Sequence, residues 1–152
     1  MRFVVQVVQN ASVTIDKKTY SEIGYGELVL YSFKPGDDRQ MVDKMIDKLL
    51  KLRIFPDELG KTNLSISKVS GQILAVSQFT LYASLKEGNR PAFTECMKAD
   101  EARQLSDYFE KKIKEEYEET KFGQFQTDMK VKLLNDGPFS IILDSVELGY
   151  ER

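Results

Sequence analysis

The chain has 152 residues, 41% hydrophobic and 30% charged, a balance that is typical of a folded globular protein and excludes a disordered chain. Its 22 basic and 24 acidic side chains leave a formal net charge of −2, so any contact with nucleic acid should be small and local, and no DNA partner is expected. The absence of histidine excludes Ser-His-Asp and Cys-His catalysis and removes the usual ligand sets of zinc, so no metal site is expected.

The length predicts a single domain over residues 1–152. No segment approaches the roughly 20 apolar residues of a membrane span, and the first residues lack the apolar core of a signal peptide. We therefore expect a cytoplasmic location and no membrane partner. The single cysteine, Cys96, agrees with a reducing compartment, and we interpret it as a small half-buried side chain rather than a reactive thiol.

Alternating apolar residues predict strands at residues 3–8, 11–15 and 26–33, which we expect to pair as consecutive antiparallel strands. After a turn at residues 35–38, apolar residues recur at helical spacing and predict an amphipathic helix that covers the sheet. The apolar face of this helix comprises Val42, Met45, Ile46, Leu49 and Leu50.

The rest of the chain alternates between strand-like and helix-like patterns. The predicted elements are a short strand at 53–55, a buried strand at 72–77, a loop at 86–91, a helix over 99–117, and strands at 129–134 and 139–148 separated by a turn at 135–138. The apolar stripe of the second helix comprises Ala102, Leu105, Phe109 and Ile113.

The exit of the strand at residues 72–77 carries the first candidate site. With imidazole absent, hydroxyls, carboxylates and backbone amides remain to carry chemistry. The successive backbone N–H groups of Phe79 and Thr80 are suited to an oxyanion hole. We interpret the Thr80 hydroxyl as binding a neighbouring carbonyl, and its role as a nucleophile stays open, although no base lies beside it in the sequence.

Three other segments have both a structural and a functional interpretation. Residues 135–138, Asn-Asp-Gly-Pro, are a turn signal in which proline can hold the backbone rigid. Residues 86–90 fit either a solvated loop or a phosphate-binding loop. Phe125 and Met129 fit either the core or an open surface on which an adenine stacks.

Short segments from residue 3 to about residue 144 match one known family in order and spacing. The most specific are the Ser-Gln-Phe-Thr-Leu run at 77–81 and the Asn-Asp-Gly-Pro run at 135–138. Further matching segments lie at residues 11–13, 22–24, 53–55, 60–63, 88–93 and 123–129. Together they resemble the D-aminoacyl-tRNA deacylase family, also called D-tyrosyl-tRNA deacylase.

This resemblance implies an α/β fold with antiparallel-rich β-sheets in barrel-like packing, two main helices and a homodimer. It implies hydrolysis of the ester between a D-amino acid and the 3′-terminal adenosine of tRNA. The Gly137-Pro138 pair would be cis and would enter the partner subunit's active site, where its carbonyls exclude an L side chain. Glycine has no side chain to exclude, so glycyl-tRNA would also be cleared.

The resemblance also implies roles within the site. The N–H groups of Phe79 and Thr80 would bind the oxyanion, with Ser77 and Gln78 shaping the pocket. The ribose 2′-OH would help to activate water, and no cofactor is implied. The residues expected to bind the adenosine are Ala102, Phe125 and Met129.

The chain departs from the family pattern at a few positions. Val7 replaces the usual arginine of the first strand, so a cation near the Gly-Pro pair is missing. Phe139-Ser140 replaces Val-Thr, Thr127 replaces an alanine, and residues 145–152 form a C-terminal extension. Two other functions stay open: a deacylase with relaxed chirality, suggested by Val7, and a nucleotide- or RNA-end-binding dimer without hydrolysis.

Overall fold

The computed structural model of the protein describes residues 1–151, and its central strand is β1 (Arg2–Ile15). The prediction of separate strands at 3–8 and 11–15 is wrong. The polar residues Gln9 and Asn10 are exposed and lie where the register with a neighbouring strand shifts, so the strand continues through a bulge. β1 therefore runs through the whole sheet.

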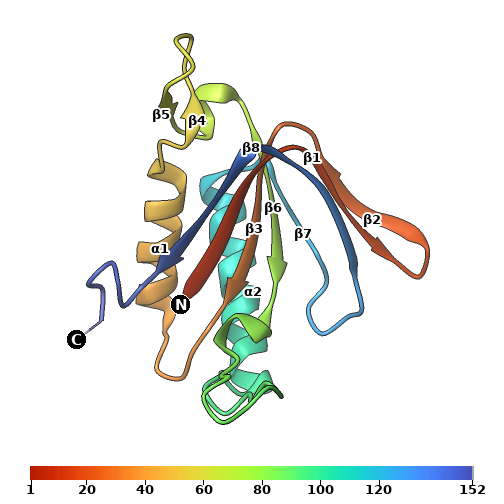
Figure 1. Cartoon of the computed structure of the whole chain (residues 1–152), viewed down its shortest axis with the longest axis vertical. Coiled ribbons are helices and arrows are strands. Elements are labelled where there is room, and N and C mark those ends of the chain that lie inside the picture. The colour runs from red at the N-terminus through yellow and green to blue at the C-terminus, as the bar shows by residue number, and fades with distance from the viewer. Residues whose placement is uncertain (152) are drawn as a thin grey trace.

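The other strands of the sheet lie on both edges of β1 (Figure 1). They are β2 (Lys18–Ile23), β3 (Gly26–Ser32), β6 (Gln72–Ser77), β7 (Thr120–Phe122) and β8 (Lys130–Asp144). One edge of β1 pairs antiparallel with β3 and then with β2, and the other edge pairs antiparallel with β8. β3 pairs parallel with β6, and β6 pairs parallel with β7.

The edge of the sheet formed by β2 curls back toward the other edge, formed by β6 and β7. The Ser21 hydroxyl of β2 donates to the Phe122 carbonyl of β7 at 2.8 Å. The Gly24 N–H donates to the Gln72 side-chain oxygen at the start of β6, also at 2.8 Å. These bonds bring the two ends of the sheet together into a nearly closed barrel, so the predicted antiparallel-rich, barrel-like sheet is confirmed.

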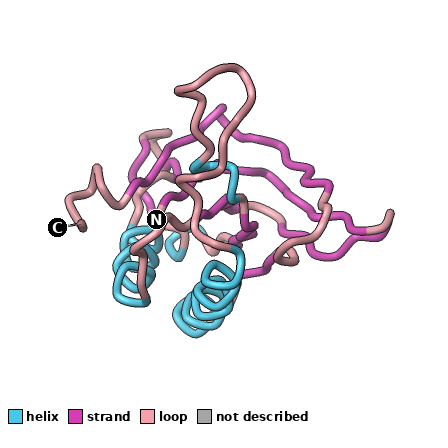
Figure 2. Tube along the Cα trace, turned by 90° about the horizontal axis from the view of Figure 1, so that it is seen from below, coloured by secondary structure: helices cyan, strands magenta, loops and turns pink. Residues whose placement is uncertain are grey.

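Two helices, α1 (Arg39–Lys51) and α2 (Ala99–Glu116), cover one face of the sheet (Figure 2). The Asp38 carboxylate caps α1 by accepting from the Met41 N–H at 2.9 Å. The helices bury the predicted residues Val42, Met45, Ile46 and Leu49 of α1 and Leu105, Phe109 and Ile113 of α2. Both predicted helices are thus confirmed, and the core lies between them and the sheet.

Several smaller elements differ from the prediction. The strand predicted at 53–55 is instead β4 (Phe55–Pro56), paired with the unpredicted β5 (Thr62–Leu64). The short polar strands β2 and β7 were also missed. The two predicted final strands form the single strand β8, which ends at Asp144, and the remaining short elements are the 3-10 helices η1 (Ser67–Val69) and η2 (Phe79–Tyr82).

The segment after β8 folds back on the body of the protein. The Ser145 N–H donates to the Met1 carbonyl at 3.0 Å, and Leu148 and Tyr150 pack against the main core. Across residues 1–151, neither helix combines the length and apolarity needed to cross a membrane.

Glu27 is a buried carboxyl without a compensating charge. It lies on β3 between Val7 of β1 and Ile73 of β6, and its side-chain oxygen Oε1 has no hydrogen-bond partner among residues 1–151. Burial raises the pKa of Glu27 from 4.5 to about 8. The folded protein therefore holds this proton more tightly than the unfolded chain does, and Glu27 lowers stability as pH rises from about 4.5 to about 8.

We expect Glu27→Gln to stabilise the protein at alkaline pH, because the amide has a similar shape and carries no charge. Thermal unfolding followed by circular dichroism should give a higher Tm than wild type at pH 9, with the difference shrinking toward pH 4.5. The exposed Glu22→Gln serves as the control and should show no such trend. A Tm difference for Glu27→Gln that is independent of pH would contradict this interpretation.

Candidate active site

A cavity of about 600 Å³ lies at the C-terminal end of β6. The start of η2 forms its floor, one wall comes from the loop before α2, and another wall comes from the loop between β7 and β8. Six of the residues predicted for the site line this cavity: Ser77, Gln78, Phe79, Ala102, Phe125 and Met129. Residues from three distant parts of the sequence thus meet in one place.

The floor of the cavity is the start of η2, where Phe79 lines the cavity and Thr80, the next residue, does not. The N–H groups of Phe79 and Thr80 occupy the first positions of this 3-10 helix, where no preceding turn supplies an acceptor. Across residues 1–151, no hydrogen bond to another protein group uses either N–H. Two neighbouring donors therefore remain available to a ligand.

The peptide between Phe79 and Thr80 is held from its carbonyl side. The Ser32 hydroxyl and the Cys96 thiol both donate to the Phe79 carbonyl, each at 3.4 Å. Because the carbonyl and the following N–H point in opposite directions, these bonds fix the direction of the Thr80 N–H. Burial, and to a lesser extent the negative charge of the nearby Glu95, raises the pKa of the Cys96 thiol. The thiol therefore stays protonated and can donate.

The Thr80 side chain is exposed, and its hydroxyl accepts from the Gln78 amide at 2.6 Å. The sequence interpretation, in which this hydroxyl binds a neighbouring carbonyl within a strand, is wrong, because Thr80 lies in η2 and its partner is a side chain. In the described part of the chain no carboxylate hydrogen-bonds this hydroxyl, so the geometry offers it no general base.

The sequence interpretation missed several residues of the cavity. They are Ser32, Phe33, Cys96, Met97, Ala99, Gln126, Asp128 and Val131. Cys96 and Met97 lie just after the family-like segment that ends at Phe93, and this closeness in sequence could have indicated that they belong to the site. Gln126 and Asp128 lie within the family-like segment at 123–129, and the others lie at or next to the ends of strands and helices with no distinctive pattern.

The Gly137-Pro138 pair lies in an excursion within β8. Gln6 of β1 pairs with Ser140, but Val8 pairs with Asn135, so residues 136–139 bulge out of the ladder. The Gly137-Pro138 bond is cis, and both residues are exposed. Gly137 has φ +131°, and a Cβ there would lie 3.1 Å from the Phe139 nitrogen, so this position requires glycine.

Asn135 closes the base of this excursion. Its side-chain Nδ2 donates to the carbonyls of Val7 and Phe139, each at 2.9 Å, and its Oδ1 accepts from the Phe139 N–H at 3.2 Å. The Gln9 amide also donates to the Asp136 carboxylate at 2.6 Å. Side chains thus replace the missing ladder bonds and hold the exposed Gly-Pro tip in one orientation.

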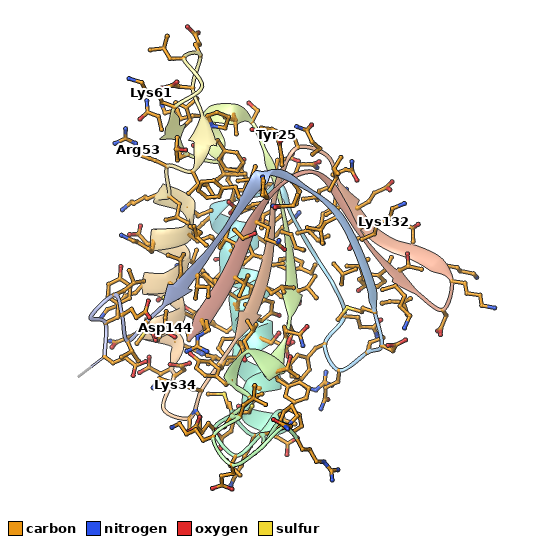
Figure 3. All side chains as sticks on the ribbon, viewed as in Figure 1. Tyr25, Lys34, Arg53, Lys61, Lys132 and Asp144 are labelled. Carbon is orange, nitrogen blue, oxygen red and sulfur yellow. The ribbon has the colours of Figure 1, made fainter. Side chains whose placement is uncertain are left out.

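The excursion and the cavity lie at opposite ends of the sheet. One row of paired residues crosses the strands at the excursion: Asn135, Val8, Gly26 and Gln72. Another crosses them at the cavity: Leu143, Phe3, Tyr31 and Ser77. The length of β6 between the two rows corresponds to about 17 Å, and Figure 3 shows Tyr25 near the first row and Asp144 near the second, at opposite ends of the sheet. Gly137 and Pro138 therefore do not reach the cavity of their own chain.

One further sequence candidate, the loop at residues 86–91, lies outside the cavity. Lys86 forms an ion pair with Glu95 at 3.6 Å, and the loop from 86 to 91 is exposed, in keeping with a solvated loop. Across residues 1–151, no three acidic or cysteine side chains lie close enough together to hold a metal ion.

Comparisons with known proteins point to one family. Residues 4–144 match the family model described as D-Tyr-tRNA(Tyr) deacylase. A D-aminoacyl-tRNA deacylase from Lactobacillus acidophilus is 50% identical over 95% of this chain and 99% of its own length. Another from Finegoldia magna is 49% identical over 95% of this chain and 98% of its own length.

Two solved structures share the fold. A protein named c-Myc DNA unwinding element binding protein has a TM-score of 0.91 at 39% identity, covering 95% of this chain and 99% of that chain. A probable eukaryotic D-amino acid tRNA deacylase has a TM-score of 0.82 at 16% identity, covering 93% and 97%. The chain therefore belongs to the D-Tyr-tRNA(Tyr) deacylase family, as the runs at 77–81 and 135–138 predict.

Proposed function

We propose that the protein hydrolyses the ester bond of D-aminoacyl-tRNA and releases a free D-amino acid and tRNA. The observation that carries this proposal is a pair of neighbouring unbonded N–H groups, one on Phe79, which lines the cavity floor, and one on Thr80, which follows it in the chain. Such donors stabilise the oxyanion that forms when water attacks an ester carbonyl, with about 3 kcal/mol lost when one is removed. Since charged tRNA is the substrate, we also propose a cytoplasmic location.

The water is activated without histidine. We propose that the 2′-OH of the terminal ribose assists by hydrogen-bonding the attacking water, which adds to the ester carbonyl. Collapse of the intermediate breaks the bond to the ribose 3′-oxygen, which leaves with a proton that the water has given up. The residues in this scheme supply orientation and charge stabilisation: the Phe79 and Thr80 N–H groups hold the oxyanion, and Ser77 and Gln78 shape the floor.

The terminal adenosine is proposed to lie against Ala102, Phe125 and Met129. These side chains line the same cavity as the floor and offer apolar and aromatic surface, on which a base stacks favourably. A recognition site limited to the tRNA end also suits a chain with net charge −2.

We further propose that chirality is selected by Gly137 and Pro138 of a second subunit in a homodimer. Their distance from the cavity of their own chain and their exposed position support this arrangement. A row of apolar residues crosses the sheet face opposite the helices: Ile142, Val4, Leu30 and Val76. Ile142 is 61% exposed at the strand edge and suits a subunit contact, and the row ends at the buried Val76, which lines the cavity.

Two other functions are distinguishable by experiment. Deacylation with relaxed chirality is favoured by Val7, because no cation supports the excursion at that position and the neighbouring Glu27 is unpaired. A binding function without hydrolysis is suggested by the name of one similar structure, which refers to a DNA unwinding element. The near-neutral charge of this chain weighs against such a role.

We expect wild-type protein to hydrolyse D-Tyr-tRNA and Gly-tRNA and to spare L-Tyr-tRNA, measured by loss of the radiolabelled ester. Asn135→Ala removes three hydrogen bonds from the excursion and should raise L-Tyr-tRNA hydrolysis at least tenfold. The exposed Asn10→Ala is the control. Rapid loss of both esters with wild type would indicate relaxed chirality, and no loss of any ester would leave a binding function.

The cross-subunit arrangement can be tested with a mixed dimer. One subunit carries Ala102→Trp, which fills the cavity, and the other carries Asn135→Ala, with different tags for purification. If the Gly-Pro pair acts on the partner, the single open cavity receives an intact pair and stays selective for D-Tyr-tRNA. Loss of selectivity in this mixed dimer would mean that the pair acts within its own subunit.

The role of the Thr80 hydroxyl can be separated from that of its N–H. Thr80→Val keeps the N–H and the side-chain shape but removes the hydroxyl that Gln78 binds. We expect kcat for D-Tyr-tRNA to stay within about threefold of wild type, because the lost hydrogen bond is exposed. A fall of a hundredfold or more would support Thr80 as a nucleophile instead.

A further inference from the structure

Arg103 joins the two walls of the cavity from the outside. It follows Ala102 on α2, and its guanidinium Nη2 donates to the Gln126 side-chain oxygen at 2.6 Å. The guanidinium carbon lies 4.9 Å from the centre of the Phe125 ring, within the range of a cation–π contact. Ala102, Phe125 and Gln126 line the cavity and Arg103 does not, so Arg103 contacts cavity-lining residues without lining the cavity itself.

Apart from Arg103, the contacts of the loop that carries Phe125 within residues 1–151 include bonds inside the loop and one to β6. The Gln124 N–H donates to the Met129 sulfur at 3.3 Å, and Gly123 lies so close to Met129 that a Cβ there would approach the sulfur to 2.6 Å. The Gly123 N–H donates to the Ala75 carbonyl of β6 at 3.1 Å. These contacts fix the base of the loop, whereas Phe125 and Gln126 lie at its outer part.

Arg103 makes the connection between this outer part and α2. Of the hydrogen bonds within residues 1–151, the Arg103–Gln126 bond is the one that joins residues 123–129 to this helix. Gln126 has φ +56°, a left-handed conformation that costs energy for a side-chain residue and is held by its surroundings. The bond from Arg103 therefore stabilises a conformation that the loop would not favour alone.

We propose that Arg103 is a positioning residue for the terminal base of the substrate, acting by holding Phe125 and Gln126 toward α2. This inference rests on the proposed function, since it assigns the Phe125 wall to the adenine. An aromatic wall that is already in place binds a base without the entropy loss of ordering the loop. Arg103 touches neither the N–H groups of the floor nor the reacting ester, so it acts on binding rather than on the chemical step.

The test compares Arg103→Ala with Arg39→Ala. The Arg39 guanidinium lies 4.8 Å from the centre of the Tyr108 ring, a matching contact between α1 and α2 that does not border the cavity. The measurements are the Kd of adenosine 5′-monophosphate by calorimetry, KM and kcat for D-Tyr-tRNA, and Tm. Loss of one cation–π contact and one hydrogen bond predicts about a tenfold rise in Kd and KM for Arg103→Ala, with kcat within twofold and Tm unchanged.

Two further variants separate positioning from a general surface effect. Arg103→Lys keeps the charge but loses the planar guanidinium, and should give an intermediate KM. Gln126→Ala should raise KM less than Arg103→Ala, and adding it to Arg103→Ala should cause little further loss, because both remove the same connection.

Unchanged Kd and KM in Arg103→Ala, a rise equalled by Arg39→Ala, or a fall in kcat alone would overturn the inference. The two proposals fail separately. If wild type binds adenosine 5′-monophosphate in an Arg103-dependent way but leaves D-Tyr-tRNA intact, the inference stands and the proposed hydrolysis is overturned. If wild type hydrolyses D-Tyr-tRNA and Arg103→Ala has the same KM, the proposed hydrolysis stands and the inference about Arg103 is overturned.

Discussion

Hydrogen bonding along both edges of β1 is the constraint on which the rest of the structure depends. One edge fixes β3 and, through it, β6, whose end forms the floor of the cavity. The other edge fixes β8, which carries the Gly-Pro excursion. Since side chains alternate between the faces of a strand, a shift of one residue on either edge would turn the core-facing side chains of the partner strand to the other face of the sheet. The cavity and the excursion are therefore held at a fixed separation by one ladder.

The site combines elements with different sources of rigidity. The floor is held by the short peptide of η2, whose carbonyl is bound from β3 and from the loop before α2. The wall that we propose for the terminal base depends on a loop that contacts α2 through Arg103. A floor built from backbone groups keeps its position when side chains change, whereas the wall depends on particular side chains. This difference suits a reaction in which the ester is constant and the attached amino acid varies.

The sequence predicted the parts of the fold that have a strong local pattern. The apolar faces of α1 and α2 and the buried run of β6 are examples, because their periodicity is visible without knowledge of the neighbours. The strands β2 and β7 are short and polar, and they form because of pairing with strands distant in the sequence. The sequence also predicted two strands where the structure has the single strand β8, because the pattern at residues 135–138 is that of a turn. The Asn135 side chain supplies the hydrogen bonds that let β8 continue through this segment. Six predicted site residues meet in the cavity, but Arg103 had no signal, since an exposed arginine on a helix is ordinary.

The bulge in β8 has a consequence for how the protein can vary. The excursion leaves and rejoins the ladder between Val8 and Gln6 of β1, and the pairing on either side of it, such as Leu133 with Ala11 and Ile141 with Val5, is independent of its length. A change in the length of the excursion would therefore leave the core residues of β8 on the same face of the sheet. The exposed excursion can thus differ in length between related chains while the folding of the sheet stays unaltered.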